Sequence, residues 1–180
     1  MQNQIVAVDI EKQTFALRYK AIGLLGRREQ SRNELQRKLH IKAVENGWRV
    51  DLEGLLDDLQ RLGLQSDLRF SEVLVRSKAN AGYGPSRLYQ WAVQYGLDSD
   101  LVFRQMQEQQ FDWFEKALQQ KRKHCGWALA DSLKERSKQA RYLYQRGFAQ
   151  EHIYHALDTQ PDEHPWVCSF IQKMFNKQVI

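Results

Sequence analysis

Cysteine, proline and uninterrupted apolar sequence are all scarce in this chain of 180 residues. Its two cysteines, Cys125 and Cys168, lie far apart and lack any paired spacing, which argues against a disulfide framework and against a cysteine-bound zinc site. No stretch approaches the roughly 18 consecutive apolar residues that a membrane-spanning helix needs. The first residues lack the positively charged start of a secretory signal. We therefore expect a cytoplasmic protein with reduced thiols and no membrane partner.

Enzyme signatures are missing as well. The sequence has no phosphate-cradling glycine loop with a lysine, no G-x-S-x-G and no H-E-x-x-H. His152 and His155 are one helical turn apart, but no third metal ligand is evident. Cys125 follows His124, yet adjacent helical side chains diverge and do not form a nucleophile pair. We expect no catalytic residue, no metal and no cofactor.

What the chain does contain is helix-forming sequence. Only three prolines and ten glycines interrupt it, and glutamine, leucine, arginine and lysine fill much of the rest. Apolar residues recur with a period of about 3.6 almost throughout, without the alternation that marks a strand. Hydrophobic residues make up 42% of the chain, enough to build a core. The sequence predicts an all-α fold.

The expected helices recur in groups of three. The segments GLDSDLV (96–102) and GFAQEHI (147–153) share a glycine, a hydrophobe, an acidic residue and a branched apolar residue at matching places. We expect three three-helix repeats over residues 14–65, 66–110 and 111–160, with a tail at 1–13 and a tail with a short helix at 161–180. Because one repeat is too small to bury its own apolar faces, the repeats should stack into an elongated, curved array of helix-turn-helix-like units.

Local signals place individual helix starts and inner faces. Ser31 with Glu34, and Ser132 with Glu135, have the spacing of capping boxes. The helix that begins at Ser66 or Asp67 is expected to turn Phe70, Val73, Leu74 and Ser77 inward.

The stretch GYGPSR (82–87) ends one helix and begins the next. Glycine tolerates the turn, and proline presets the backbone of the new helix, so Gly82, Gly84 and Pro85 need no further role. Tyr83 lies on the tight turn, and Arg87 lies in a first helical turn, where the dipole disfavours a cation. A solvated arginine would explain this, and so would an outward Tyr–Arg pair that anchors a partner.

Basic residues collect toward the two ends of the expected core, and the formal net charge is +5. Such clusters could neutralise phosphates, pair with acidic protein groups, or form a solvated face without a partner. On the helix expected over 133–147, Lys134, Lys138 and Arg141 share one face because they are spaced four and three apart. The other candidates are Arg27, Arg28, Arg32, Arg37, Lys38, Lys121, Arg122 and Lys123.

Three motifs, taken together, resemble the RecX family of bacterial regulators of the RecA recombinase. They are SRNELQRKL (31–39), LGLQSDLRF (62–70), which adds Arg69 to the candidates, and GYGPSRL (82–88). The resemblance covers roughly residues 14–158, and it departs from the family where Leu64 replaces an aromatic residue. It implies a protein that lies in the groove of the RecA filament on DNA and inhibits its ATPase, strand-exchange and co-protease activities.

The sequence therefore favours a monomeric, non-enzymatic regulator of a recombinase filament, with weaker, electrostatic contact to single- or double-stranded DNA. The rival hypothesis is a general helix-turn-helix-like DNA-binding protein that needs no recombinase.

Overall fold

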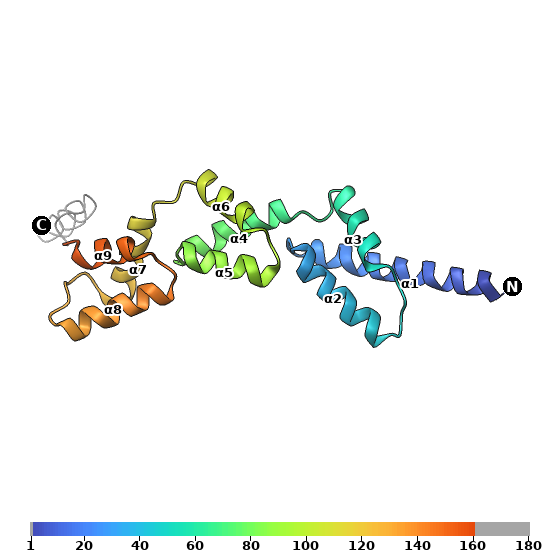
Figure 1. Cartoon of the computed structure of the whole chain (residues 1–180), viewed down its shortest axis with the longest axis horizontal. Coiled ribbons are helices and arrows are strands. Elements are labelled where there is room, and N and C mark those ends of the chain that lie inside the picture. The colour runs from blue at the N-terminus through green and yellow to red at the C-terminus, as the bar shows by residue number, and fades with distance from the viewer. Residues whose placement is uncertain (1, 161–180) are drawn as a thin grey trace, which may run out of the picture. The chain divides into compact units, whose positions relative to one another are not determined.

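A computed structural model describes the backbone of residues 2–160 and the side chains of residues 9–160. This part of the chain contains nine α-helices and no strand, which confirms the all-α prediction (Figure 1). The expected helix in 161–180, and Cys168 with it, lie outside the described residues. The helices are α1 (Gln2–Leu25), α2 (Arg32–Glu45), α3 (Leu52–Arg61), α4 (Asp67–Asn80), α5 (Pro85–Tyr95), α6 (Ser99–Glu108), α7 (Trp113–Cys125), α8 (Leu133–Gln145) and α9 (Gln150–Asp158).

The first helix is longer than the sequence reading predicts. It begins at Gln2, where a tail was expected up to residue 13. No glycine or proline occurs before Gly23, so nothing in the sequence stops the helix from extending toward the amino end. The Gln13 amide also donates to Asp9 one turn earlier at 3.2 Å, and the Thr14 hydroxyl donates to the Ile10 carbonyl at 2.8 Å.

The chain divides into two compact units. The first comprises residues up to Ser77 together with Tyr89–Gln109, and the second comprises Lys78–Leu88 together with the chain from Gln110 onward. The segment Lys78–Leu88 contains the GYGPSR stretch and so belongs with α7, α8 and α9 rather than with the helices that precede it. The repeat boundaries stay a prediction, because these units divide the chain differently.

The core of the first unit lies among α1, α2 and α3. The helices meet through a set of buried apolar side chains: Leu17, Ala21, Leu35, Leu39, Ala43, Leu55, Leu56 and Leu59. Asp51 begins α3 by accepting a hydrogen bond from the Gly54 N–H at 3.0 Å. Leu62, which follows α3, is 53% exposed and lies outside this core.

Ser31 begins α2 as predicted, since its hydroxyl accepts from the Glu34 N–H at 3.1 Å. The second half of the expected capping box is replaced. The Glu34 carboxylate accepts instead from the side chains of Arg28 and Lys38. Two charged donors satisfy a buried carboxylate better than one backbone N–H does.

The inner face of α4 differs in part from the expected one. Phe70 and Leu74 are buried as predicted, but Val73 is 41% exposed and Ser77 is also exposed. Ser71 and Val75 are buried in their place. The buried face of the helix is therefore shifted from Val73 and Ser77 toward Ser71 and Val75.

The second unit has its core among α7, α8 and α9. Its buried apolar residues are Ala117, Leu118, Leu143, Phe148, Ile153, Ala156 and Leu157. Ser132 begins α8 by accepting from the Glu135 N–H at 3.2 Å, while the Glu135 carboxylate pairs with Lys138 at 3.3 Å. Within the described residues, no helix is both long and apolar enough to cross a membrane.

Candidate binding surface

The GYGPSR stretch is joined to the turn between α8 and α9 by backbone hydrogen bonds. The Gly84 N–H donates to the Arg146 carbonyl at 2.8 Å, and the Ser86 N–H donates to the Gly147 carbonyl at 3.1 Å. These two segments lie far apart in the sequence and meet within the second unit. The stretch is therefore more than a helix boundary, because it fixes the start of α5 onto the end of α8.

Glycine is required at this junction for close approach. A Cβ added to Gly84 would overlap the carbonyl of Gly147 and the backbone nitrogen of Phe148. Gly147 itself has a φ of +88°, and a Cβ there would lie 2.5 Å from the Arg87 nitrogen. Gly84 thus packs on the backbone of Gly147, and Gly147 packs on that of Arg87, so neither position admits a larger residue without moving the chain.

A row of aromatic and cationic side chains lies beside the junction. The Arg146 guanidinium lies 4.7 Å from the centroid of the Tyr83 ring and 5.3 Å from that of Tyr142. The His124 ring stacks on the Tyr142 ring, with the two ring centroids 3.9 Å apart and an interplanar angle of 12°. We call Tyr83, Arg146, Tyr142 and His124 the aromatic ladder. Aromatic rings and an arginine guanidinium held in a fixed position are typical anchors at protein interfaces.

Tyr83 and Arg87, the predicted outward pair, have different environments. Tyr83 is half-buried under Arg146, so its ring is held in place rather than projecting freely. Arg87 is exposed at the start of α5, next to the Gly84–Gly147 contact. Both belong to the second unit, which brings the pair to the same region as the aromatic ladder.

The exposed face of α8 carries the predicted basic stripe. Lys134, Lys138 and Arg141 are all exposed, and the helix continues through all three. Of these three residues, only Lys138 forms an ion pair with a described residue, Glu135, and the two side chains are 66% and 45% exposed. Such a pair contributes little to stability, so the lysine can exchange it for another anion. Lys123, near the end of α7, is also exposed.

Lys121 and Arg122 of the same predicted cluster serve the fold instead. Lys121 is 1% exposed, and its ammonium donates to the carbonyls of Ala128 at 2.7 Å and Trp127 at 3.3 Å. The guanidinium of Arg122 lies 4.2 Å from the centroid of the Trp127 ring. Burial lowers the pKa of both groups. These two residues fix the loop after α7, and Lys121 offers no surface to a partner.

Most of the basic candidates in the first unit already have acidic partners. Arg28 and Lys38 both bind the buried carboxylate of Glu34, with Lys38 at 2.7 Å. Burial raises the pKa of Glu34, but the hydrogen bonds from Arg28 and Lys38 outweigh it and leave this pKa below its usual value. These three side chains form a compact network that fixes the α1–α2 turn to α2.

Two further arginines in the first unit are also engaged. Arg32 contacts Glu53 and Asp57, each at 2.7 Å. Arg69 pairs with Glu29 at 2.7 Å and donates to the Leu64 carbonyl at 3.2 Å.

Arg27 and Arg37 are exposed and form no ion pair within the described residues. They are the two candidates of the first unit that remain open to an anion.

His152 and Cys125 both have structural surroundings. His152 is 7% exposed, its Nδ1 accepts from the Ala149 N–H at 3.3 Å, and its ring meets Phe114 edge to face at 4.8 Å. Burial lowers the pKa of His152 and raises that of the Cys125 thiol. Among residues 9–160, no three His, Cys, Asp or Glu side chains gather around a point that a metal could occupy.

Sequence reasoning did not identify the inner members of the aromatic ladder. His124 lies in the last turn of α7, Tyr142 lies in the last turn of α8, and Arg146 follows α8 directly. The Gly84–Gly147 contact brings them to Tyr83. A weak signal was present, since Gly147 follows Arg146 at the end of a helix and so predicts a tight turn there. Nothing in the sequence says which turn it packs against.

The comparisons with known proteins agree on one family. Residues 111–157 match the family model for the third three-helix domain of RecX. The chain is 38% identical over 144 residues to a regulatory protein RecX of Stenotrophomonas maltophilia, covering 80% of this chain and 86% of that protein. It is 36% identical to one of Ectopseudomonas mendocina, covering 77% of this chain and 90% of that protein.

Solved structures share the fold. A crystal structure of RecX from Lactobacillus salivarius superposes with a TM-score of 0.65 at 22% identity, covering 83% of this chain and 95% of that one. A second crystal structure, of a regulatory protein RecX, gives a TM-score of 0.68 at 18% identity, covering 87% of this chain and 78% of that one.

Proposed function

Because the chain belongs to the RecX family, we propose that it regulates the RecA recombinase by binding the RecA filament on DNA. The bound protein inhibits the ATPase, strand-exchange and co-protease activities of the filament and thereby limits recombination and the SOS response. The observation that carries the proposal is the 38% identity to a regulatory protein RecX over 80% of this chain.

The proposed contact surface lies on the second unit. It combines the aromatic ladder with Arg87 and with the exposed cations of α8 and the end of α7. Arginine forks and aromatic faces supply fixed geometry, while lysines supply charge that tolerates more than one partner. A filament of protein on DNA presents two kinds of anion to these cations, namely acidic side chains and phosphates.

The mechanism we propose is non-enzymatic. A bound protein changes ATP turnover only if it has a higher affinity for one conformation of the filament than for another. The side chains of the ladder are held by stacking and by the Gly84–Gly147 contact before any partner arrives, which lowers the entropy lost on binding.

The test measures ATP hydrolysis by RecA on single-stranded DNA while the purified protein is added. We expect inhibition at or below one molecule per recombinase protomer. Charge reversal at Lys134, Lys138 and Arg141 should raise the half-inhibitory concentration roughly tenfold or more, since each lost contact to an anion weakens binding.

The matched control reverses Lys12, Arg76 and Arg104, which are also exposed and carry the same charge. This set also breaks one exposed ion pair, Arg76 with Glu72 at 3.1 Å, as the α8 set breaks Lys138 with Glu135. The control should inhibit like the unaltered protein. Equal loss in both sets would assign the effect to net charge and remove α8 from the proposed surface.

A general DNA-binding protein is the second candidate, and the basic face of α8 favours it. Three exposed cations on one helical face can neutralise phosphates without any recombinase. Comparing binding to naked DNA with binding to the filament separates the two functions. Tighter binding to the filament at the same salt concentration supports the regulator, whereas equal binding supports the alternative.

A further inference from the structure

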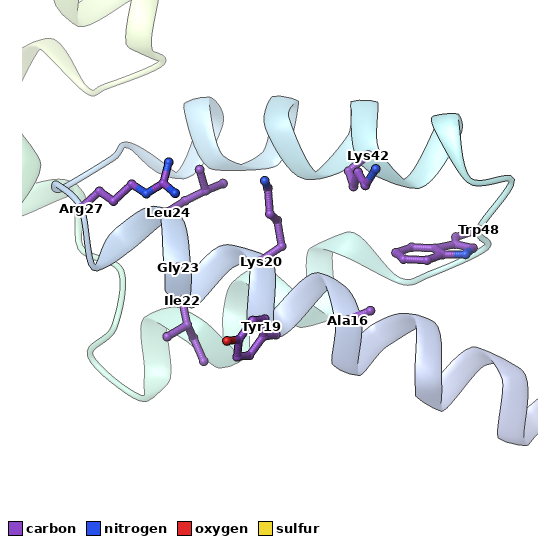
Figure 2. A pocket seen from close by; sticks show the side chains of 9 residues that line it. All are labelled: Ala16, Tyr19, Lys20, Ile22, Gly23, Leu24, Arg27, Lys42 and Trp48. Carbon is purple, nitrogen blue, oxygen red and sulfur yellow. The ribbon is translucent and has the colours of Figure 1, made fainter.

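A groove between α1 and α2 in the first unit has no role in the surface described above. It encloses about 560 Å³ and runs from the turn after α1 to the loop after α2. Figure 2 shows Arg27 near one end, Trp48 near the other, and the Lys20 side chain rising from α1 toward α2 between them.

All charged residues that line this groove are cations, set among apolar and aromatic residues. Lys20, Arg27 and Lys42 all contribute to it, and no acidic residue does. Lys20 and Arg27 form no ion pair with any described residue, while Lys42 meets Glu45 only at 3.4 Å in an exposed i,i+3 pair. Lys20 comes from α1, Arg27 from the turn after it and Lys42 from α2, so the cations line both sides of the groove. Charges that line a concave surface attract an anionic ligand more strongly than the same charges spread over a flat one.

Gly23 leaves the floor of the groove bare. It lies in the last turn of α1, where glycine weakens a helix relative to alanine. Neither backbone strain nor crowding explains the glycine, because its φ is not positive and an added Cβ would meet nothing within 4 Å. A missing side chain does allow a ligand to approach the backbone closely. The open floor lies between the cations, as Figure 2 shows.

Trp48 provides an aromatic surface at the end of the groove. The residue is partly buried against the core of the first unit, so that contact holds the position of its ring. An indole beside a row of cations is the combination that single-stranded nucleic acids use, with bases stacked on rings and phosphates tracked by lysine and arginine.

We propose that this groove binds a short stretch of single-stranded nucleic acid. The phosphates contact Lys20, Arg27 and Lys42, the sugar–phosphate backbone passes over Gly23, and one base stacks on Trp48. A carboxylate-rich peptide would use the cations but would gain little from the indole, so the aromatic end favours a nucleic acid. Binding here does not require a recombinase, and its failure would leave the proposed function untouched.

The test measures fluorescence anisotropy of a labelled oligothymidylate of about ten nucleotides, within the range that one such binding site covers, with the full chain and no recombinase. Lys20→Ala with Arg27→Ala should weaken binding roughly tenfold at moderate salt. The slope of log K against log salt should become shallower by about 1.4, or about 0.7 for each lost phosphate contact. Trp48→Leu should keep the packing of the residue and weaken binding roughly fivefold.

A Cβ at Gly23 would meet nothing within 4 Å, so the side chain of Gly23→Leu can enter the groove without displacing the backbone. This variant should weaken binding while circular dichroism stays unchanged. Arg76→Ala with Arg104→Ala removes the same charge elsewhere in the first unit and should leave binding unchanged. Two results would overturn the proposal. One is that the groove variants bind the oligothymidylate as tightly as the unaltered protein, including the case in which only reversal of the α8 cations weakens this binding. The other is a polyglutamate that competes equally well while Trp48→Leu has no effect, which would make the ligand an acidic peptide.

Discussion

A series of three glycine-to-alanine substitutions separates the two reasons for which a fold keeps glycine. Gly84 is crowded but has ordinary backbone angles, Gly63 has a φ of +69° with open space around it, and Gly23 has neither constraint. Each alanine therefore tests one physical effect, and the differences between the three variants are free of changes in side-chain chemistry.

Gly84→Ala should be the most destabilising of the three. Its Cβ would overlap backbone atoms of Gly147 and Phe148, so the turn must move away from the end of α8. That movement breaks the hydrogen bonds from Gly84 and Ser86, each contributing about 1 kcal/mol. It also removes the stacking of Arg146 on Tyr83, roughly another 0.5–1 kcal/mol. We expect a loss of about 2–3 kcal/mol in the free energy of unfolding.

The other two variants should both be more stable than Gly84→Ala. Gly63→Ala should cost only the left-handed backbone penalty, about 1 kcal/mol. Gly23→Ala should stabilise α1 by roughly 0.5 kcal/mol, because alanine favours helix and nothing obstructs it. Urea unfolding followed by far-UV circular dichroism measures all three. A Gly84→Ala protein as stable as the Gly63→Ala one would refute the tight junction between the GYGPSR stretch and the α8–α9 turn.

Further predictions concern buried charged and titratable groups. Lys121→Met should leave the Trp127 and Ala128 carbonyls without their donor, and faster proteolysis within the loop after α7 would reveal it, with Lys123→Met as an exposed control. Burial keeps the pKa of His152 below 6.5, so the unfolded chain takes up the proton first and the free energy of unfolding should fall as the pH drops below about 6.5. His152→Gln should flatten that dependence, and an unchanged slope would assign it to other groups. Because the pKa of Glu34 is lowered, its network stabilises the fold above about pH 4.5 and is lost on further acidification. Glu34→Gln should therefore cost about 1–3 kcal/mol at neutral pH and much less in acid, as urea unfolding at both pH values would measure.

Helix content and helix starts could be read from the sequence because they depend on neighbours within a few residues. Ser31, Asp51 and Ser132 accept the backbone N–H groups that their spacing predicts. The partner of Glu34 could not be read in this way, since Arg28 and Lys38 outcompete the backbone N–H that the local rule assigns to it. In α4, Val75 is buried and Val73 is exposed, whereas Val73 was expected to be the buried one. Which residues of a helix are buried depends on what packs against it, and local spacing does not show this.

The environments of the basic residues were even harder to predict from the sequence. Their spacing placed Lys134, Lys138 and Arg141 on one face, and α8 has that face. Their spacing could not show that Lys121 is buried against two carbonyls, or that Arg32 and Arg69 have acidic partners 21 to 40 residues away. Whether the exposed residues bind a partner stays a prediction that binding measurements must test.

The dependence of the second unit on Lys78–Leu88 limits how this protein can be dissected. A fragment cut just before α7 keeps all three helices of its last group but removes the N–H donors of Gly84 and Ser86. The carbonyls of Arg146 and Gly147 would then turn to solvent, and Arg146 would lose one of its two rings. A fragment that starts at Lys78 retains these contacts, so the smallest autonomous piece of the carboxyl half should begin near the carboxyl end of the chain's fourth helix.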